Sequence, residues 1–329
     1  MSEPILEVKD LTVEYTSGKS IVQAVNGLSF SLEKGEALGL VGETGAGKTT
    51  TALSIMRLIT SPPGRIKNGE ILFEGRNLLE LSDKDMQKLR GEKISMIFQD
   101  PMTALNPVKT VGDQISEVIR LHEKVSRLEA AAKAKEMLEM VGIPGERYNE
   151  YPHQFSGGMK QRVVIAIALA CNPALLIADE PTTALDVTIQ AQVLAIIEQI
   201  IQNLKTTLIL ITHDLGVVAD ICQKVAIMYA GEVVEYGTLD HIYNHTLHPY
   251  SIGLFESIPN FNESVHRLKP IKGLMPDPTN LPKGCSFCLR CPDCQERCTQ
   301  EKFPLVEAEP GHFVRCVKYL DSEGGVHIG

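Results

Sequence analysis

Gly42-Glu43-Thr44-Gly45-Ala46-Gly47-Lys48-Thr49 is the stretch that decides the fold, because it fits the pattern G-x-x-x-x-G-K-[ST] in its expected context. The apolar run Ala37–Val41 precedes it as a buried strand, and Thr49–Met56 follows it as a helix. Glycines let successive backbone N–H groups point inward at a polyphosphate, and the start of the helix adds unpaired N–H groups and a positive dipole end. The stretch therefore predicts a nucleoside triphosphate site.

Two side chains of this loop have expected roles. Lys48 should reach the β- and γ-phosphates, and the hydroxyl group of Thr49 should bind Mg²⁺. A glycine-rich turn that binds nothing is the alternative, but strand, loop, lysine, threonine and helix all follow in order. The predicted nucleotide-binding residues of the loop are Gly42, Glu43, Thr44, Gly45, Ala46, Gly47, Lys48, Thr49 and Thr50.

The composition restricts the class of protein. A chain of 329 residues is long for one domain and indicates a main domain with additions. The net charge of −9 argues against a protein that coats nucleic acid. No signal peptide is visible, and the longest apolar runs, such as Val163–Cys171, fall short of the about 20 residues of a membrane span. We expect a soluble, cytosolic chain that reaches a membrane only through partners.

The order of predicted elements indicates an α/β core with an inserted helical segment. Strands are expected at 5–13, 21–32, 69–73, 94–98, 175–179 and 207–211, with a closing hairpin at 224–236. Helical periodicity at 111–123 and 126–141 falls where no strand is expected. The predicted domains are an ATP-binding core at 1–100 and 158–237, a helical subdomain at 101–157 and a Cys-rich C-terminal region at 238–329.

Two further motifs suit phosphate chemistry. The buried strand Leu175–Asp179 ends in two acids, so Asp179 should enter the Mg²⁺ shell and Glu180 should polarise the attacking water. The alternative is an ordinary helix cap or a solvated strand end. Ser156-Gly157-Gly158-Met159 opens a long helix with bare backbone N–H groups, which makes a second anion site or an ordinary cap.

From about residue 5 to 237 the chain resembles the ATP-binding cassette (ABC) ATPases. The resemblance rests on six motifs in the family's order, namely the loop at 42–49, Gln99 at a strand end, Ser156-Gly157-Gly158, the acidic strand at 175–180, Ala184-Leu185-Asp186 and Thr212-His213-Asp214. The signature has Met159 where Gln is commonest. The resemblance implies an α/β, P-loop nucleotide-binding core with an antiparallel β region, the helical insertion and a small C-terminal region.

The resemblance also implies roles for single residues. Two cassettes would face each other head to tail, with ATP between the phosphate loop of one and Ser156–Met159 of the other, beside Asp186 of the D-loop. Glu180 would be the general base, and His213 would contact the γ-phosphate. Gln99 would ligate Mg²⁺, orient water and sense the transmembrane partner. Tyr15 would stack on adenine, although a solvent-facing strand aromatic is the alternative.

A narrower resemblance points to dipeptide and oligopeptide importers. It rests on Phe98–Pro107 and on the tail segments His248-Pro249-Tyr250, Ser257-Ile258-Pro259 and Leu281–Cys285. It implies an ATPase at the cytoplasmic face of the membrane, with a second, identical or homologous cassette, two permease subunits and, indirectly, a solute-binding protein, but no nucleic acid. The alternatives are an importer of nickel or another small solute, and a soluble ABC ATPase of DNA repair or translation.

The tail holds six of the eight cysteines, between Cys285 and Cys316. In a reducing compartment such a cluster indicates metal ligation before disulfides. Cys285, Cys291, Cys298 and Cys316 resemble the pattern of peptide-importer tails associated with a [4Fe–4S] cluster, with structural Zn²⁺ as the alternative. A ferredoxin-like register of Cys288, Cys291, Cys294 and Cys298 ranks second, because Thr299 stands where that run has proline. The cluster would be either structural or redox-sensing.

Overall fold

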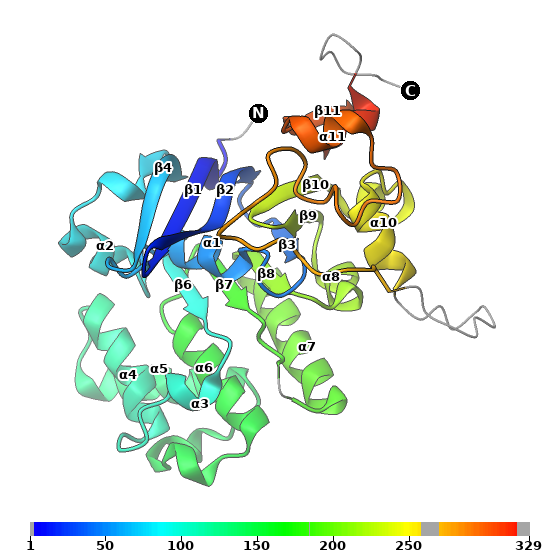
Figure 1. Ribbon diagram of the computed structural model, residues 1–329. Coiled ribbons are helices and arrows are strands. Elements are labelled where there is room, and N and C mark those ends of the chain that lie inside the picture. Colours follow the sequence, from blue (N-terminus) through cyan, green and yellow to red (C-terminus); the bar gives the residue numbers. More distant parts are fainter. Residues whose placement is uncertain (1–2, 184, 258–269, 321–329) are drawn as a thin grey trace. The chain divides into compact units, whose positions relative to one another are not determined.

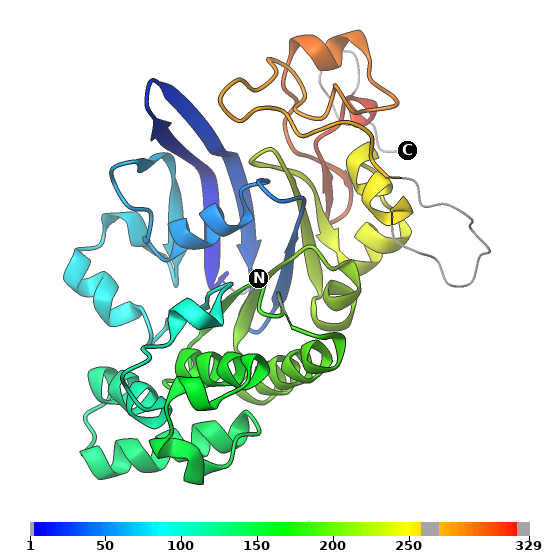
Figure 2. The same cartoon turned by 60° about the horizontal axis from the view of Figure 1, so that its bottom comes forward.

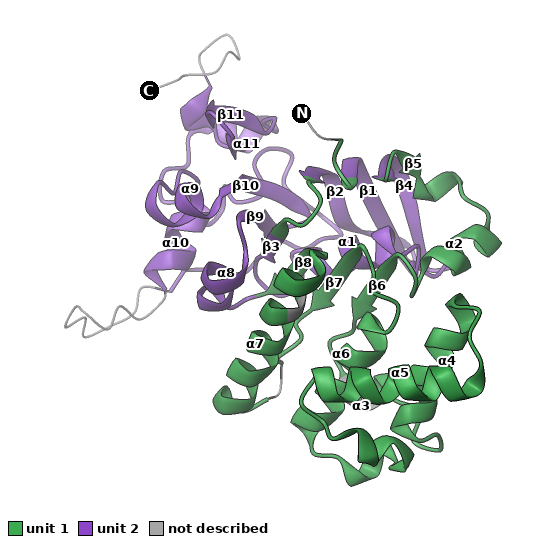
Figure 3. Cartoon of the chain, turned by 180° about the vertical axis from the view of Figure 1, so that it is seen from behind, with its two compact units in different colours: residues 1–6, 32–37, 73–212 green, residues 7–31, 38–72, 213–329 purple. Residues whose placement is uncertain are grey.

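The computed structural model of the protein describes residues 3–183, 185–257 and 270–320 (Figure 1). The chain forms two compact units, each assembled from separate segments (Figure 3). Unit 1 contains residues 1–6, 32–37 and 73–212, and unit 2 contains residues 7–31, 38–72 and 213–329. In the part of the chain that the structure describes, no helix combines the length and apolarity of a membrane span.

Three parallel strands form the core of unit 1. β7 (Leu175–Asp179) lies between β6 (Ile94–Ile97) and β8 (Thr207–Thr212), and all their side chains are buried. Such continuous apolar runs are typical of parallel strands covered on both faces. The strand pairs run in one direction, so their carboxyl ends share one edge of the sheet, which is where α/β folds place ligands.

The helices of unit 1 carry their own start signals. Ser126 and Glu129 form a reciprocal capping box at the start of α5, and Thr110 caps α4. Helices α4, α5 and α6 lie side by side in both views (Figures 1 and 2) and contact one another. The helices are α2 (Asp83–Leu89), α3 (Pro101–Ala104), α4 (Val111–His122), α5 (Arg127–Met140), α6 (Gly157–Leu169) and α7 (Val187–Leu204), and the short strand β5 spans Arg76–Asn77.

Unit 2 contains strands of two sheets. In one, β1 (Leu6–Ser17) lies between β2 (Ser20–Leu32) and β4 (Gly64–Phe73). In the other, β3 (Ala37–Val41) runs parallel to β9 (Lys224–Tyr229), which forms an antiparallel hairpin with β10 (Glu232–Thr238). Helix α1 (Lys48–Ile55) follows β3, and α8 (Leu215–Ile221) precedes β9. The mixed α/β architecture predicted from the sequence is confirmed.

The C-terminal region adds strands and short helices to unit 2. β12 (His312–Val314) pairs with β10 and with β11 (Val306–Glu309). The buried Glu235 carboxylate accepts hydrogen bonds from the backbone N–H groups of Leu247 and His248, and it pairs with Nε2 of His312 at 2.9 Å. The helices here are α9 (Leu239–Asn244), α10 (Pro249–Glu256) and α11 (Glu296–Gln300). The tail therefore folds onto β10.

Candidate nucleotide-binding and hydrolysis site

The phosphate loop joins the buried strand β3 to α1 in unit 2. Gly47 is the N-cap of α1 with φ 98°, a left-handed conformation that favours glycine, and no side chain caps the helix. A Cβ atom on Gly42 would lie 2.3 Å from the carbonyl oxygen of Met228, and one on Gly47 would lie 2.4 Å from that of Ala24. The loop therefore excludes side chains at both ends, which lets its backbone approach a bound anion closely.

Lys48 lies within this loop. Its side chain is only 6% exposed, and its ammonium group donates to the carbonyl oxygens of Gly42 at 2.7 Å and Glu43 at 3.2 Å. Thr49 next to it is exposed at the start of the helix. The sequence motif therefore folds into a strand, a tight loop and a helix start around a cation, which is the arrangement that polyphosphate binding needs.

In unit 1, the polar residues that follow β6 and β7 meet at one sheet edge. Nε2 of Gln99 donates to Oε2 of Glu180 at 3.0 Å, and Oγ1 of Thr183 donates to the same oxygen at 2.8 Å. Asp179, the last residue of β7, is 2% exposed. The structure thus brings Gln99 and Glu180 together, while their roles in catalysis stay predictions. It adds Thr183, which the sequence analysis missed because a threonine two residues after a proline carries no motif.

The backbone of Glu180 is unusual for a residue with a side chain. Its φ of 46° lies in the left-handed region, and its N–H group donates to the carbonyl oxygen of Ile211 at 2.9 Å. Such a conformation costs of order 1–3 kcal/mol for a non-glycine residue and persists where the surroundings enforce it. The half-buried Glu180 therefore leaves β7 in a turn that the surrounding structure enforces.

The predicted signature begins α6. The Ser156 side chain caps the helix by accepting from the N–H group of Met159, and both Ser156 and Gly157 are exposed. A Cβ atom on Gly158 would lie 2.3 Å from Cγ2 of Ile189 in α7, whereas one on Gly157 would have nothing within 4 Å. Asp186 caps α7 by accepting from the N–H group of Ile189 at 3.0 Å. The exposed helix start can receive an anion, and α6 lies close against α7.

Two other predicted site residues lie in unit 2. Tyr15 ends up half-buried in β1, where its ring borders Gly64, whose Cβ atom would lie 2.7 Å from it. His213 is exposed just before Asp214, the N-cap of α8. Stacking of Tyr15 on adenine and contact of His213 with a phosphate stay predictions. Ala184 of the D-loop motif and Ile258 and Pro259 of the tail motif lie outside the described residues.

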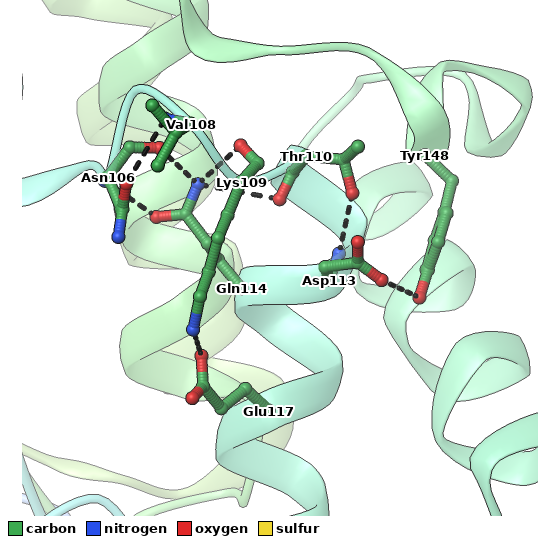
Figure 4. Close-up of polar contacts among 8 residues, drawn as sticks. All are labelled: Asn106, Val108, Lys109, Thr110, Asp113, Gln114, Glu117 and Tyr148. Atoms are coloured by element: carbon green, nitrogen blue, oxygen red, sulfur yellow. Dashed lines mark hydrogen bonds and ion pairs between the residues drawn. The ribbon is translucent and has the colours of Figure 1, made fainter.

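The segment after Gln99 is fixed to α4 by polar contacts (Figure 4). The amide group of Gln114 accepts from the N–H group of Asn106 at 2.8 Å and donates to the carbonyl oxygens of Asn106 and Lys109. Lys109 pairs with Glu117, and the Tyr148 hydroxyl donates to Asp113. Beside these groups lies a cavity of about 600 Å³ lined by Lys109, Asp113, Ser116, Glu117, Arg120, Leu121, Arg127 and Tyr148.

The tail cysteines are free thiols that lie near one another in sequence and affect one another electrostatically. Burial raises the pKa of the Cys285 thiol to about 12, and the nearby thiols of Cys298, Cys288 and Cys316 contribute to the rise. Among the residues described, however, no three His, Cys, Asp or Glu side chains are arranged to hold a metal ion. The predicted ligand set Cys285, Cys291, Cys298 and Cys316 therefore stays a prediction.

Known proteins resemble this chain along most of its length. A family model described as "ABC transporter" matches residues 25–183, and one described as "Oligopeptide/dipeptide transporter, C-terminal region" matches residues 234–298. An oligopeptide transport ATP-binding protein of Bacillus subtilis (strain 168) is 52% identical over 314 residues, which cover 94% of this chain and 88% of that protein. A dipeptide transport ATP-binding protein of the same strain is 49% identical over 316 residues, covering 95% and 94%.

The fold also resembles solved structures. A dimeric ATP-binding cassette in a post-hydrolysis state, bound to ADP and Pi, superimposes with a TM-score of 0.65 and 28% sequence identity. The match covers 71% of this chain and 98% of that chain.

Proposed function

Because this chain belongs to the ABC transporter ATPases of the oligopeptide and dipeptide transport family, we propose that it hydrolyses ATP to power peptide uptake through a multi-subunit importer. The cassette fold and the ATPase activity predicted from the sequence are confirmed by these relatives. The observation that carries the peptide assignment is the likeness beyond the cassette, since the transporter C-terminal model matches residues 234–298.

In the proposed hydrolysis, water attacks the γ-phosphorus in line with the bond to the ADP oxygen, and Glu180 accepts the proton of that water. The hydrogen bonds from Gln99 and Thr183 to one oxygen of Glu180 restrict the orientation of the carboxylate. Lys48 and the loop N–H groups bind the β- and γ-phosphates. Mg²⁺, supplied with ATP, would be held by Thr49, Gln99 and Asp179 and would neutralise the developing charge.

The remaining residues have proposed roles in nucleotide contact and assembly. Tyr15 stacks on adenine, and His213 contacts the γ-phosphate. A second cassette, identical or homologous, docks its Ser156–Met159 helix start and its Asp186 loop against the bound ATP of the first, in keeping with the dimeric form of the similar solved cassette. The exposure of Ser156 and Gly157 supports this docking.

We further propose that two permease subunits bind the helical subdomain at 101–157, while the ATP-binding core comprises 1–100 and 158–237 and the tail 238–329. The cavity beside α4 is lined by residues of this helical subdomain, and one of them, Leu121, is 75% exposed. The protein would then lie at the cytoplasmic face of the membrane, and the solute-binding protein would contact only the permeases.

The function is tested in the protein's own host. Deletion of its gene should abolish uptake of labelled dipeptides and oligopeptides, and a copy of the wild-type gene should restore it. Lys48→Ala should fail to restore uptake, because it removes the charge that faces the β- and γ-phosphates. Nickel uptake is measured in the same strains. Loss of nickel uptake with intact peptide uptake would assign the alternative substrate.

For the tail we propose a [4Fe–4S] cluster, with Zn²⁺ as the alternative, on Cys285, Cys291, Cys298 and Cys316. The support is the chemistry of the donor set, since six thiols within 32 residues suit soft metal ions. Iron, sulfide and zinc are quantified after anaerobic purification of the wild type, Cys285→Ser and Cys294→Ser. Iron loss in Cys285→Ser alone supports this set, whereas loss in Cys294→Ser alone supports the ferredoxin-like register.

A further inference from the structure

The C-terminal region contacts the phosphate loop through one charged pair within unit 2. Nη1 and Nη2 of Arg290 donate to Oε2 and Oε1 of Glu43 at 3.0 and 3.1 Å, so the ion pair is bidentate. The side chain of Arg290 is 5% exposed, whereas that of Glu43 is 32% exposed. A two-pronged contact of this kind is stronger and more directional than an ordinary surface ion pair, because it satisfies two parallel hydrogen bonds away from most of the solvent.

Arg290 is itself held in place by the tail. Its Nε atom donates to the carbonyl oxygen of Lys272 at 3.1 Å, and Nη2 donates to that of Ile271 at 3.4 Å. The guanidinium carbon lies 5.7 Å from the ring centre of Tyr229 and 5.9 Å from that of Phe287. Carbonyl groups and aromatic faces thus fix the orientation of the cation before it meets Glu43.

A second tail residue holds the main chain of Glu43. The N–H group of Glu43 donates to the hydroxyl oxygen of Tyr250 at 3.1 Å. Tyr250 is fully buried, and its ring lies 4.6 Å from that of Tyr229 and 5.4 Å from that of Phe287. Packing within this aromatic cluster restricts where the hydroxyl group can lie.

Glu43 is in turn connected to the groups that would face a phosphate. Its carbonyl oxygen accepts hydrogen bonds from Nζ of Lys48 at 3.2 Å and from the N–H group of Ala46 at 3.1 Å. The N–H group, the carbonyl group and the carboxylate of one residue therefore link the tail on one side to Lys48 and the loop on the other.

We propose that Arg290 and Tyr250 are positioning residues that pre-form the phosphate loop for nucleotide, so that the tail takes part in ATP binding. A loop with three glycines among six residues has much conformational freedom to lose when a ligand orders it. Contacts that order the loop beforehand remove this cost from binding and raise affinity. The inference rests on the proposed binding of ATP at residues 42–49.

The first test measures ATP affinity by equilibrium titration of the full-length protein. Arg290→Met keeps the approximate length of the side chain but removes its charge and its donors, and it should raise the Kd for ATP about threefold to thirtyfold. Arg290→Lys keeps the charge without the fork and should recover only part of the affinity. The matched control is Arg297→Met, which removes a tail arginine whose partner is Glu301 rather than the loop. It should bind ATP as the wild type does.

The second test separates positioning from general damage. Glu43→Ala should weaken ATP binding as Arg290→Met does. If both act through the same contact, the variant that carries both substitutions should have a Kd for ATP no higher than that of the single variant with the higher Kd. Tyr250→Phe removes only the hydroxyl that accepts from Glu43 and should also raise the Kd. In hydrolysis assays the KM for ATP should rise while kcat changes little, because none of these residues touches the attacking water.

Two results would decide against the proposal. Unchanged ATP affinity in both Arg290→Met and Glu43→Ala would overturn it. The proposal would also be overturned if Arg290→Met reduced ATP affinity equally in the wild-type protein and in Glu43→Ala. The effect of Arg290 would then not depend on its contact with Glu43. If Arg290→Met fails to fold, Glu43→Ala and Arg290→Lys carry the same comparison. Absence of ATP binding in the wild type would instead refute the proposed function, which the same titration reveals.

Discussion

At the scale of single residues, the carboxylate of Glu180 combines strain with fixed hydrogen bonds. Its left-handed backbone and its two donors, Gln99 and Thr183, both restrict where the charge can lie. A general base works when it is held within hydrogen-bond reach of the water that it deprotonates. The strained backbone conformation of Glu180 thus accompanies a restricted position of the carboxylate, which a general base needs.

Glu180→Gln should bind ATP normally and hydrolyse it about 10²–10⁴-fold more slowly, because the amide keeps the shape of the side chain but cannot accept the proton. Phosphate release under single-turnover conditions and a parallel ATP titration check this outcome. Hydrolysis near the wild-type rate would remove Glu180 from the role of base.

Thr183→Val should lower kcat about tenfold with little change in the KM for ATP, since it deletes the hydroxyl group that donates to Glu180 and keeps the side-chain volume. Thr183→Ser retains a hydroxyl and should recover most of the rate. If valine and serine behave alike in steady-state assays, the hydrogen bond has no part in orienting the base.

At the scale of elements, the sequence predicted best where periodicity and caps agree. The helices expected at 111–123 and 126–141 appear as α4 and α5 within a residue or two, because Thr110 and Ser126 cap them. The buried strands β6, β7 and β8 likewise follow from apolar runs. β11 and β12 escaped prediction, since strands of four and three residues carry no periodicity and depend on pairing with β10.

The candidate site divides in the same way. Sequence motifs located Lys48, Gln99, Asp179 and Glu180, because each depends on neighbours in the chain. Sequence alone could not find the contact of Arg290 with Glu43, which joins residues 247 positions apart. No local pattern encodes such a pair, and only the folded tail creates it.

Gly158→Ala should destabilise the packing of α6 on α7 by about 1–3 kcal/mol, because the new methyl group would overlap Ile189. Gly157→Ala is the control, since its methyl group would meet nothing within 4 Å. Urea unfolding of both variants measures the difference. Equal urea midpoints for the two variants would show that α7 can shift away from the new methyl group without loss of stability.

At the scale of the whole molecule, burial of His248 makes stability depend on pH. Burial, with a smaller contribution from the nearby Arg315, lowers the pKa of His248 from 6.5 to about 3. Between these values the unfolded chain binds a proton that the folded protein excludes, so stability falls as the pH falls, by about 1.4 kcal/mol per pH unit at most. His248→Asn keeps an N-cap acceptor for α10 and should reduce this slope by one proton in urea unfolding from pH 6.5 to 4. An unchanged slope would contradict the assignment.

The pairing of β12 with β10 also bears on how the protein behaves in a crowded cell. A strand with an unpaired edge offers a row of free N–H and C=O groups to any other extended chain. β12 covers that side of β10 at Glu235 and Tyr236 and leaves the four-residue strand β11 at the edge of the sheet, which is a shorter target for intermolecular pairing. A nascent or proteolysed chain that ends before residue 306 would bare this edge along with the apolar surface beneath it. Aggregation during synthesis or after cleavage is therefore a hazard that the last strands of the chain suppress.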